Sequence, residues 1–155
     1  MIQKIKFCGK NSFAGAGRRE LFRSLVQTIT RDHNMTLLGL QYVFLTDHAL
    51  VKMNIKYLKH TSFTDVISFD LSSSHQTIDG EIYISIDRVK ENSLVLSTPY
   101  QEELLRVMAH GLFHLLGYKD KTHKENREMR QKEDAFLSLW RNSTTAPLEI
   151  KTNKS

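Results

Sequence analysis

Cysteine is nearly absent from this sequence, which has one, Cys8, among 155 residues. A single thiol cannot form an intramolecular disulfide, so a small disulfide-stabilised domain is excluded. The low cysteine content fits a reducing compartment better than a secreted protein.

Long apolar runs are also missing. No stretch approaches the roughly 20 apolar residues that span a bilayer, and the opening segment MIQKIKFCGKNSF has no apolar core of the kind found in a cleaved signal peptide. We therefore expect a cytoplasmic protein that does not associate with membranes.

Repeats and domain linkers are absent too, and the length suits one hydrophobic core. We predict a single domain over residues 1–142. Residues 143–155, which contain few apolar side chains, are predicted to form a flexible C-terminal tail.

Positively charged residues outnumber negatively charged ones. The chain has 22 Lys and Arg against 17 Asp and Glu, a formal net charge of +5. This moderate excess favours polyanions over acidic protein partners, and it is compatible with nucleic-acid binding without proving it.

Hydrophobic periodicity predicts alternating strands and helices. The predicted strands are about 2–7, 37–45, 65–71 and 80–86, and the last two are close enough in sequence to pair antiparallel. The predicted helices are about 18–32, 47–57, 87–94, 99–117 and 124–140.

The most informative segment is HGLFHLLGYKD, residues 110–120. On a helix, His110 and His114 lie on one face and can present two imidazoles to one ion, which suits zinc. Gly117 can end the helix with a positive φ and reverse the chain, which brings Asp120 back toward the helix. The Asp120 carboxylate is an acceptable third ligand. Three protein ligands leave a fourth position for water or substrate.

A second interpretation of this segment needs no metal. Gly117 can serve only as a helix C-cap, Asp120 can cap the next helix, and the two histidines can be solvated or hydrogen-bonded. The two interpretations are compatible.

A general base is missing at the place where zinc peptidases have one. Those enzymes carry Glu directly after the first histidine, whereas this chain has Gly111. A glycine there removes bulk and lets another chain segment or a substrate approach.

Three ordered blocks of sequence resemble the YbeY family of metal-dependent endoribonucleases. HGLFHLLGY resembles the family signature H-G-x-L-H-L-x-G-Y-D-H, TDVISFD resembles its TDVLSF strand, and DGEIYIS resembles its L-G-D-I-x-I-S strand. Asn54 within MNIKYL also fits the family's L-N-x-x-Y segment. The resemblance covers about residues 40–130.

This resemblance implies an α+β fold, with a small mixed sheet packed with about five helices and a metal site like that of zinc hydrolases. Two of the family's three zinc-binding histidines correspond to His110 and His114. The third corresponds to Asp120, and the aspartate before it to Lys119, so this ligand departs from the family pattern. His123 is the alternative third ligand.

The resemblance further implies a single-strand-specific endoribonuclease with one Zn²⁺ per chain and no other small-molecule cofactor. Its expected role is late ribosomal RNA maturation, at the 3′ end of the small-subunit rRNA, and ribosome quality control. The expected partners are ribosomal RNA and the small ribosomal subunit.

A second departure concerns a basic residue. Several family members have an Arg implicated in catalysis just after the tyrosine, where this chain has Leu58, with Lys56, Lys59 and His60 nearby. We predict His110, His114 and Lys59 as catalytic residues. The residues predicted to contact the RNA backbone are Arg18, Arg19, Arg23, Lys56 and Lys59.

Aromatic side chains at Phe63, Phe69 and Tyr118 are possible stacking faces for bases, although core packing is the commoner use of such residues. Two other functions stay open. A metzincin-like metallopeptidase would explain the spacing of the metal ligands, and a non-enzymatic ribosome-associated protein would use zinc only to tie two helices together.

Overall fold

The protein is built on a four-stranded mixed sheet with the strand order β1-β2-β4-β3. The computed structural model describes residues 4–9, 13–58 and 64–154. Its strands are β1 (Ile5–Gly9), β2 (Thr36–Leu45), β3 (Val66–Asp70) and β4 (Thr77–Ser85). β1, β2 and β4 pair in parallel, and β3 runs antiparallel to β4 at one edge.

Five α-helices accompany the sheet in the described part of the chain. They are α1 (Ala16–Asp32), α2 (Asp47–Met53), α3 (Ile86–Val95), α4 (Tyr100–Leu115) and α5 (His123–Lys154), and a π-helical turn, η1 (Asn54–Leu58), continues α2. This arrangement confirms the predicted α+β class and a sheet packed with five helices. In the described part of the chain, no helix combines the length and apolarity needed to cross a membrane.

Local sequence explains several helix boundaries. The Thr46 hydroxyl accepts a hydrogen bond from the backbone N–H of Ala49 at the start of α2. At the start of α3 the capping hydroxyl belongs to Ser85, which accepts a hydrogen bond from the backbone N–H of Arg88. Asp87 accepts from the backbone N–H of Asp47 and ties α3 to α2.

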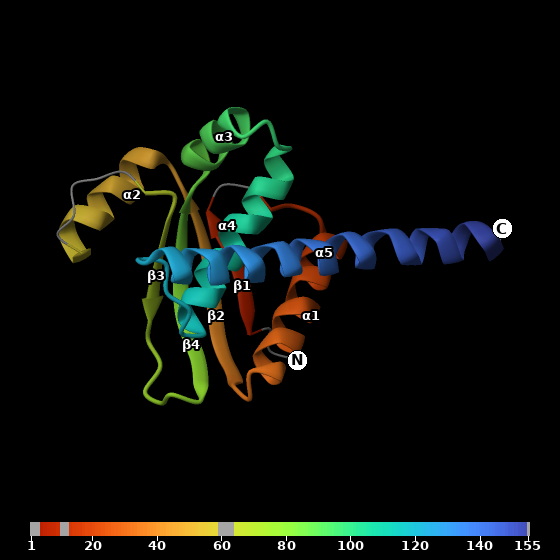
Figure 1. Cartoon of the computed structure of the whole chain (residues 1–155), viewed down its shortest axis with the longest axis horizontal. Helices are drawn as coiled ribbons and strands as arrows, with labels where there is room; N and C mark the ends of the chain where they lie inside the picture. The colour runs from red at the N-terminus through yellow and green to blue at the C-terminus, as the bar shows by residue number, and fades with distance from the viewer. Residues whose placement is uncertain (1–3, 10–12, 59–63, 155) are drawn as a thin grey trace.

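The core lies between the sheet and α1, α4 and α5 (Figure 1). Phe22 of α1, Tyr42 of β2 and Phe136 of α5 are fully buried, and the Phe22 ring makes edge contacts with the other two. The Tyr42 hydroxyl donates to the carbonyl of Met108 in α4. These contacts hold α4 on the sheet and α5 against α1.

The backbone of α5 is helical through Lys154, and its C-terminal end projects from the rest of the molecule (Figure 1). The sequence predicted a flexible tail over residues 143–155. The structure gives helical backbone to most of that segment, while its flexibility stays a prediction.

Gly111 allows α4 to approach the sheet closely. A Cβ atom at this position would lie 2.7 Å from Cγ2 of Ile82 on β4, and the Ser68 hydroxyl on β3 donates to the Gly111 carbonyl at 3.2 Å. The glycine after His110 therefore serves close helix–sheet packing, which is one of the two uses predicted for it.

Candidate metal centre

The C-terminal half of α4 and the loop after it bring together three side chains that could bind a metal. His110 and His114 are one turn apart on α4. Gly117 has a φ of +104° and, with Tyr118, donates backbone hydrogen bonds to the carbonyls of His114 and Phe113. This C-cap reverses the chain, and Asp120 returns to the histidines.

The ligand atoms of the three residues converge. Oδ2 of Asp120 lies 3.2 Å from Nε2 of His110 and 3.1 Å from Nε2 of His114, and the two Nε2 atoms are 3.0 Å apart. All three atoms belong to the cluster of His110, His114 and Asp120 that could hold a metal ion.

These separations fit zinc. Two ligands about 2.0–2.1 Å from a tetrahedral ion are themselves about 3.3–3.4 Å apart. The observed spacings are slightly shorter, so a small outward shift of the side chains would make room for an ion between the three atoms. Two imidazole nitrogens and one carboxylate oxygen are a donor set that could hold zinc.

The cluster is open to solvent on one side. The side chains of His110, His114 and Asp120 are 22%, 30% and 36% exposed, so they are neither enclosed nor fully solvated. A cavity of about 340 Å³ borders His110 on the side of α5, and its polar lining includes Asp65, Glu103 and Arg106. Water or a small part of a substrate can reach the metal ligands.

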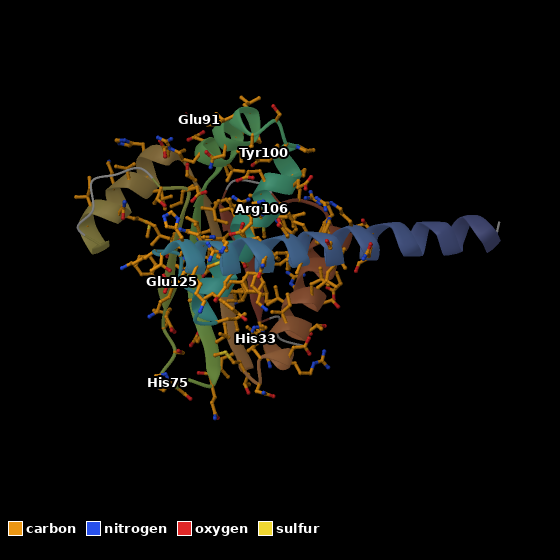
Figure 2. All side chains as sticks on the ribbon, in the orientation of Figure 1. His33, His75, Glu91, Tyr100, Arg106 and Glu125 are labelled. Carbon is orange, nitrogen blue, oxygen red and sulfur yellow. The ribbon has the colours of Figure 1, made fainter. Side chains whose placement is uncertain are left out.

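A further carboxylate, Glu133, reaches the cluster from α5. Oε2 of Glu133 lies 2.7 Å from Nδ1 of His110, and Oε1 of Glu133 accepts from Arg106 at 3.1 Å. Figure 2 labels Arg106 at the crossing of α4 and α5, where these side chains meet. Arg106 also pairs with Asp134 at 2.9 Å, which links it to two successive residues of α5.

Sequence reasoning did not identify Glu133, although a signal was present. Met129, Phe136 and Leu137 form the buried stripe of α5, and Glu133 lies on the same face, four residues after the first and three before the second. A carboxylate on an apolar stripe is rarely buried without a partner. The partner could not be named because it lies 23 residues away along the chain.

Burial and charge shift the pKa values of three residues around the cavity. Burial alone would lower the pKa of His110, but the hydrogen bond and charge of Glu133, with the charges of Asp120 and Asp65, outweigh burial and raise it. Burial raises the pKa of Asp65 and that of Glu103 above their ordinary values. The region thus concentrates carboxyl groups that are costly to ionise.

The alternative third ligand, His123, lies elsewhere. It is the first residue of α5, it is exposed, and it does not belong to the cluster. Asp120 and not His123 is brought to the two histidines. Lys119, which stands where the family has an aspartate, is exposed beside it.

The arginines predicted to contact RNA hold the fold together at α1. Arg19 donates to the carbonyl of Phe13, and Arg23 donates to the carbonyl of Ile5. Arg18 packs its guanidinium 4.7 Å from the Phe13 ring centre and bonds Gln101 at the start of α4. These contacts explain the three residues structurally, and their role in RNA binding stays a prediction.

The other basic and aromatic residues considered for RNA binding are only partly described by the structure. Lys56 is exposed on η1, whereas Lys59, His60 and Phe63 lie outside the described residues. Phe69 packs edge-on against Tyr83.

The Tyr118 ring, a possible stacking face, has protein neighbours. Its hydroxyl is 2.9 Å from Nε2 of His33, and its ring makes an edge contact with Phe113 and lies 5.3 Å from the Lys132 ammonium. No base is needed to explain its position.

Comparison with known proteins identifies the family of the chain. The sequence model of the family described as Endoribonuclease YbeY matches residues 9–141. The chain is 48% identical over 122 residues to the Endoribonuclease YbeY of Cytophaga hutchinsonii, an alignment that covers 79% of this chain and 85% of that protein. It is 37% identical to the protein of the same name from Christiangramia forsetii, with 88% and 94% covered.

The fold also has a counterpart among solved structures. A Thermotoga maritima protein with a known solution structure superposes with a TM-score of 0.61, at 24% sequence identity and with 94% of each chain covered. At this identity the likeness concerns the fold alone.

Proposed function

The chain belongs to the YbeY endoribonuclease family, and we propose that it is a metal-dependent endoribonuclease that cleaves single-stranded RNA. The observation that carries the proposal is the convergence of His110, His114 and Asp120 within hydrogen-bonding distance of one another. Such a set leaves one coordination position for water or a substrate oxygen.

The residues present fit a zinc ion, and His110, His114 and Asp120 would hold it. When bound, the ion supplies a Lewis acid that polarises a phosphoryl oxygen or lowers the pKa of a water molecule. Asp120 contributes one negative charge that a third histidine would not contribute, so the ligand set has a net charge one unit lower than three imidazoles. The partial exposure of His114 and Asp120 lets an RNA phosphate reach the centre.

Base recognition is not required by this geometry. Phosphate contacts from exposed basic side chains such as Lys56 give affinity that does not depend on sequence. Lys59 is the proposed further catalytic cation. A lysine can stabilise phosphoryl charge as a point charge but not as a bidentate fork.

We propose ribosomal RNA precursors as the substrate, with cleavage at the 3′ end of the small-subunit rRNA and a part in ribosome quality control, in the cytoplasm. This proposal rests on family membership and on the net charge of +5. The small ribosomal subunit is the proposed partner.

The test uses the purified full chain and an end-labelled single-stranded RNA that carries the 3′ end of a small-subunit rRNA precursor. We expect cleavage that a chelator abolishes and added Zn²⁺ restores. His114→Ala should lose both bound zinc and cleavage, whereas the control His123→Ala should keep both, because His123 lies outside the cluster. A duplex of the same sequence should be cut much more slowly.

Other outcomes would point elsewhere. Chelator-insensitive cleavage, or equal activity in His114→Ala, would contradict the metal-dependent mechanism. Zinc-dependent hydrolysis of a peptide library without RNA cleavage would favour a metallopeptidase. Stoichiometric zinc with neither activity would favour a ribosome-associated protein that uses the metal to join two helices.

A further inference from the structure

Glu133 is a buried carboxylate whose position the metal ligands alone do not explain. It is 5% exposed, which makes it one of the few buried charged residues in the described part of the chain. Ionised carboxylates are expensive to bury unless they are paired and hydrogen-bonded. Both oxygens of Glu133 have partners, namely His110 on one side and Arg106 on the other.

The hydrogen bond to His110 has a chemical direction. An ionised carboxylate can only accept, so Nδ1 of His110 must carry the proton in their 2.7 Å contact. In the neutral ring this leaves the lone pair on Nε2, the atom that faces Asp120 and His114. Glu133 therefore selects the tautomer of His110 that can bind a metal.

The packing of α5 keeps Glu133 in this place. Met129 and Phe136, one turn before and one turn after, are buried against the core, so the backbone between them has little freedom. Arg106 joins Oε1 of Glu133 to Asp134 and balances the buried charge. The carboxylate thus approaches His110 from a second helix with a fixed orientation.

We propose that Glu133 is a positioning residue of the metal centre, which holds His110 in the Nδ1-protonated tautomer and aims its Nε2 at the ion. The inference rests on the proposed function only in that it takes the cluster to be a metal site. Carboxylates in this relation to a metal-binding histidine typically contribute about 10–100-fold to metal affinity or activity. Glu133 contacts His110 and Arg106 and is not one of the candidate ligands.

Two variants and a matched control test the proposal by metal affinity. Competition with a chromophoric chelator gives the Zn²⁺ dissociation constant of the full chain. Glu133→Ala should weaken binding by about 10–100-fold. Glu133→Gln should lose less, because its amide oxygen can still accept from Nδ1. Asp134→Asn should bind zinc within about twofold of the parent chain, because Asp134 also pairs with Arg106 but its side chain is exposed.

A second readout needs no variant. Nitrogen NMR of the parent chain, at a pH where the His110 ring is neutral, should show a protonated Nδ1 and an unprotonated Nε2. The opposite tautomer would overturn the proposal even if Glu133→Ala failed to fold. So would a folded Glu133→Ala with unchanged zinc affinity, or an Asp134→Asn as weakened as Glu133→Ala, since that would show a general disturbance of α5.

These measurements separate the inference from the proposed function. RNA cleavage is not among them, so a chain that binds zinc in a Glu133-dependent way but leaves RNA intact would support the positioning role and contradict the nuclease. A chain that binds no zinc would contradict the metal site itself. The tautomer of His110 can still be measured on that metal-free protein.

Discussion

Asp120 is the residue at which this chain departs from a three-histidine site, and the structure brings its carboxylate to the two histidines. Removing one of three ligands should cost more than removing a supporting group. We therefore expect Asp120→Ala to weaken zinc binding by more than about 100-fold, the upper end of the range for outer partners of metal ligands. Metal content and chelator competition measure this.

The variant Asp120→His restores the three-histidine pattern and tests whether zinc binding depends on the aspartate. Asp120→His replaces a charged oxygen ligand by a neutral nitrogen, so zinc should still bind.

The prediction for Asp120→Ala has a clear contrary outcome. If Asp120→Ala retained full zinc affinity while His123→Ala lost it, His123 would be the third ligand, and the loop between Gly117 and α5 would have to rearrange on binding.

A second prediction at the residue scale concerns the stability of a Gly111 variant. Its replacement by Ala would place a methyl group 2.7 Å from Cγ2 of Ile82, a fully buried side chain. Overpacking of this kind typically costs about 1–3 kcal/mol, and we expect Gly111→Ala to lower the free energy of unfolding by that amount. Thermal or denaturant unfolding of the metal-free chain measures it.

Gly17 is the matched control, because it also lies in a helix but a Cβ there would meet nothing within 4 Å. Gly17→Ala should leave stability unchanged or raise it by less than about 1 kcal/mol. Equal effects of the two substitutions would mean that α4 can move away from β4 without loss.

The sequence predicts which side chains meet at the candidate metal site only where these residues are close in the chain. His110, His114 and Asp120 stand within 11 residues of one another, and helix geometry with a glycine cap is enough to gather them. Glu133 joins the site only through the crossing of two helices, which depends on how both pack on the sheet. No local rule specifies that crossing.

At the scale of the elements, α4 carries a polar stripe on an otherwise buried helix. Glu103, Arg106, His110 and His114 follow at steps of three and four residues, and the apolar faces on either side pack against the sheet and the other helices. The stripe faces α5 and the cavity beside it. A helix with this pattern can be both the centre of the core and the wall of a site.

The buried end of this stripe predicts a dependence of stability on pH. Burial raises the pKa of Glu103 above its ordinary value of 4.5, so the unfolded chain releases this proton at a lower pH than the folded chain does. Between these two pKa values the unfolded state binds fewer protons, and folding loses stability as pH rises. Glu103→Gln removes this loss.

We expect Glu103→Gln to gain stability relative to the parent chain as pH rises from below 4.5 towards neutrality, with the difference smallest in acid. Denaturant unfolding of both metal-free proteins at a series of pH values measures the difference. A stability difference that is constant over this range would show that Glu103 ionises with the same pKa in the folded and unfolded chains.

Periodicity predicted the elements well, because amphipathic helices and alternating strands leave a local pattern. The antiparallel pair β3–β4 was also predictable from the short connection between its strands. The parallel pairing of β1 with β2 and of β2 with β4 was not predicted, because each joins strands separated by at least one helix. The predicted helix 47–57 changes to a π-helical turn at Asn54, which periodicity does not signal.

At the scale of the whole molecule, the net charge of +5 has two different uses. Arg18, Arg19 and Arg23 are half-buried and bond to backbone carbonyls or to Gln101. Gln101 and His114 are 13 residues apart on α4, or about 20 Å along its axis. Arg18 therefore contacts α4 far along its axis from His114, and replacing any of the three arginines would disturb the fold as well as any RNA contact.

Lys56 allows a cleaner test of the RNA-binding surface, because its side chain is exposed on η1. Binding of single-stranded RNA should weaken with salt, with a log–log slope of about −0.7 for each phosphate contacted. If Lys56 makes one such contact, Lys56→Ala should reduce the magnitude of the slope by about 0.7 and leave zinc content unchanged. Fluorescence anisotropy of a labelled RNA at several salt concentrations measures the slope.

The control for this test is Lys6→Ala, which removes the same charge from β1, at the edge of the sheet opposite β3. Lys6 is exposed, so its loss should change the slope much less than the loss of Lys56 if contact with phosphate decides the effect. Equal reductions by the two variants would mean that RNA responds to the net charge of the molecule and not to a defined track. An unchanged slope in Lys56→Ala would move the track to Arg18, Arg19 and Arg23, and these arginines would then have to bind RNA while keeping their contacts within the fold.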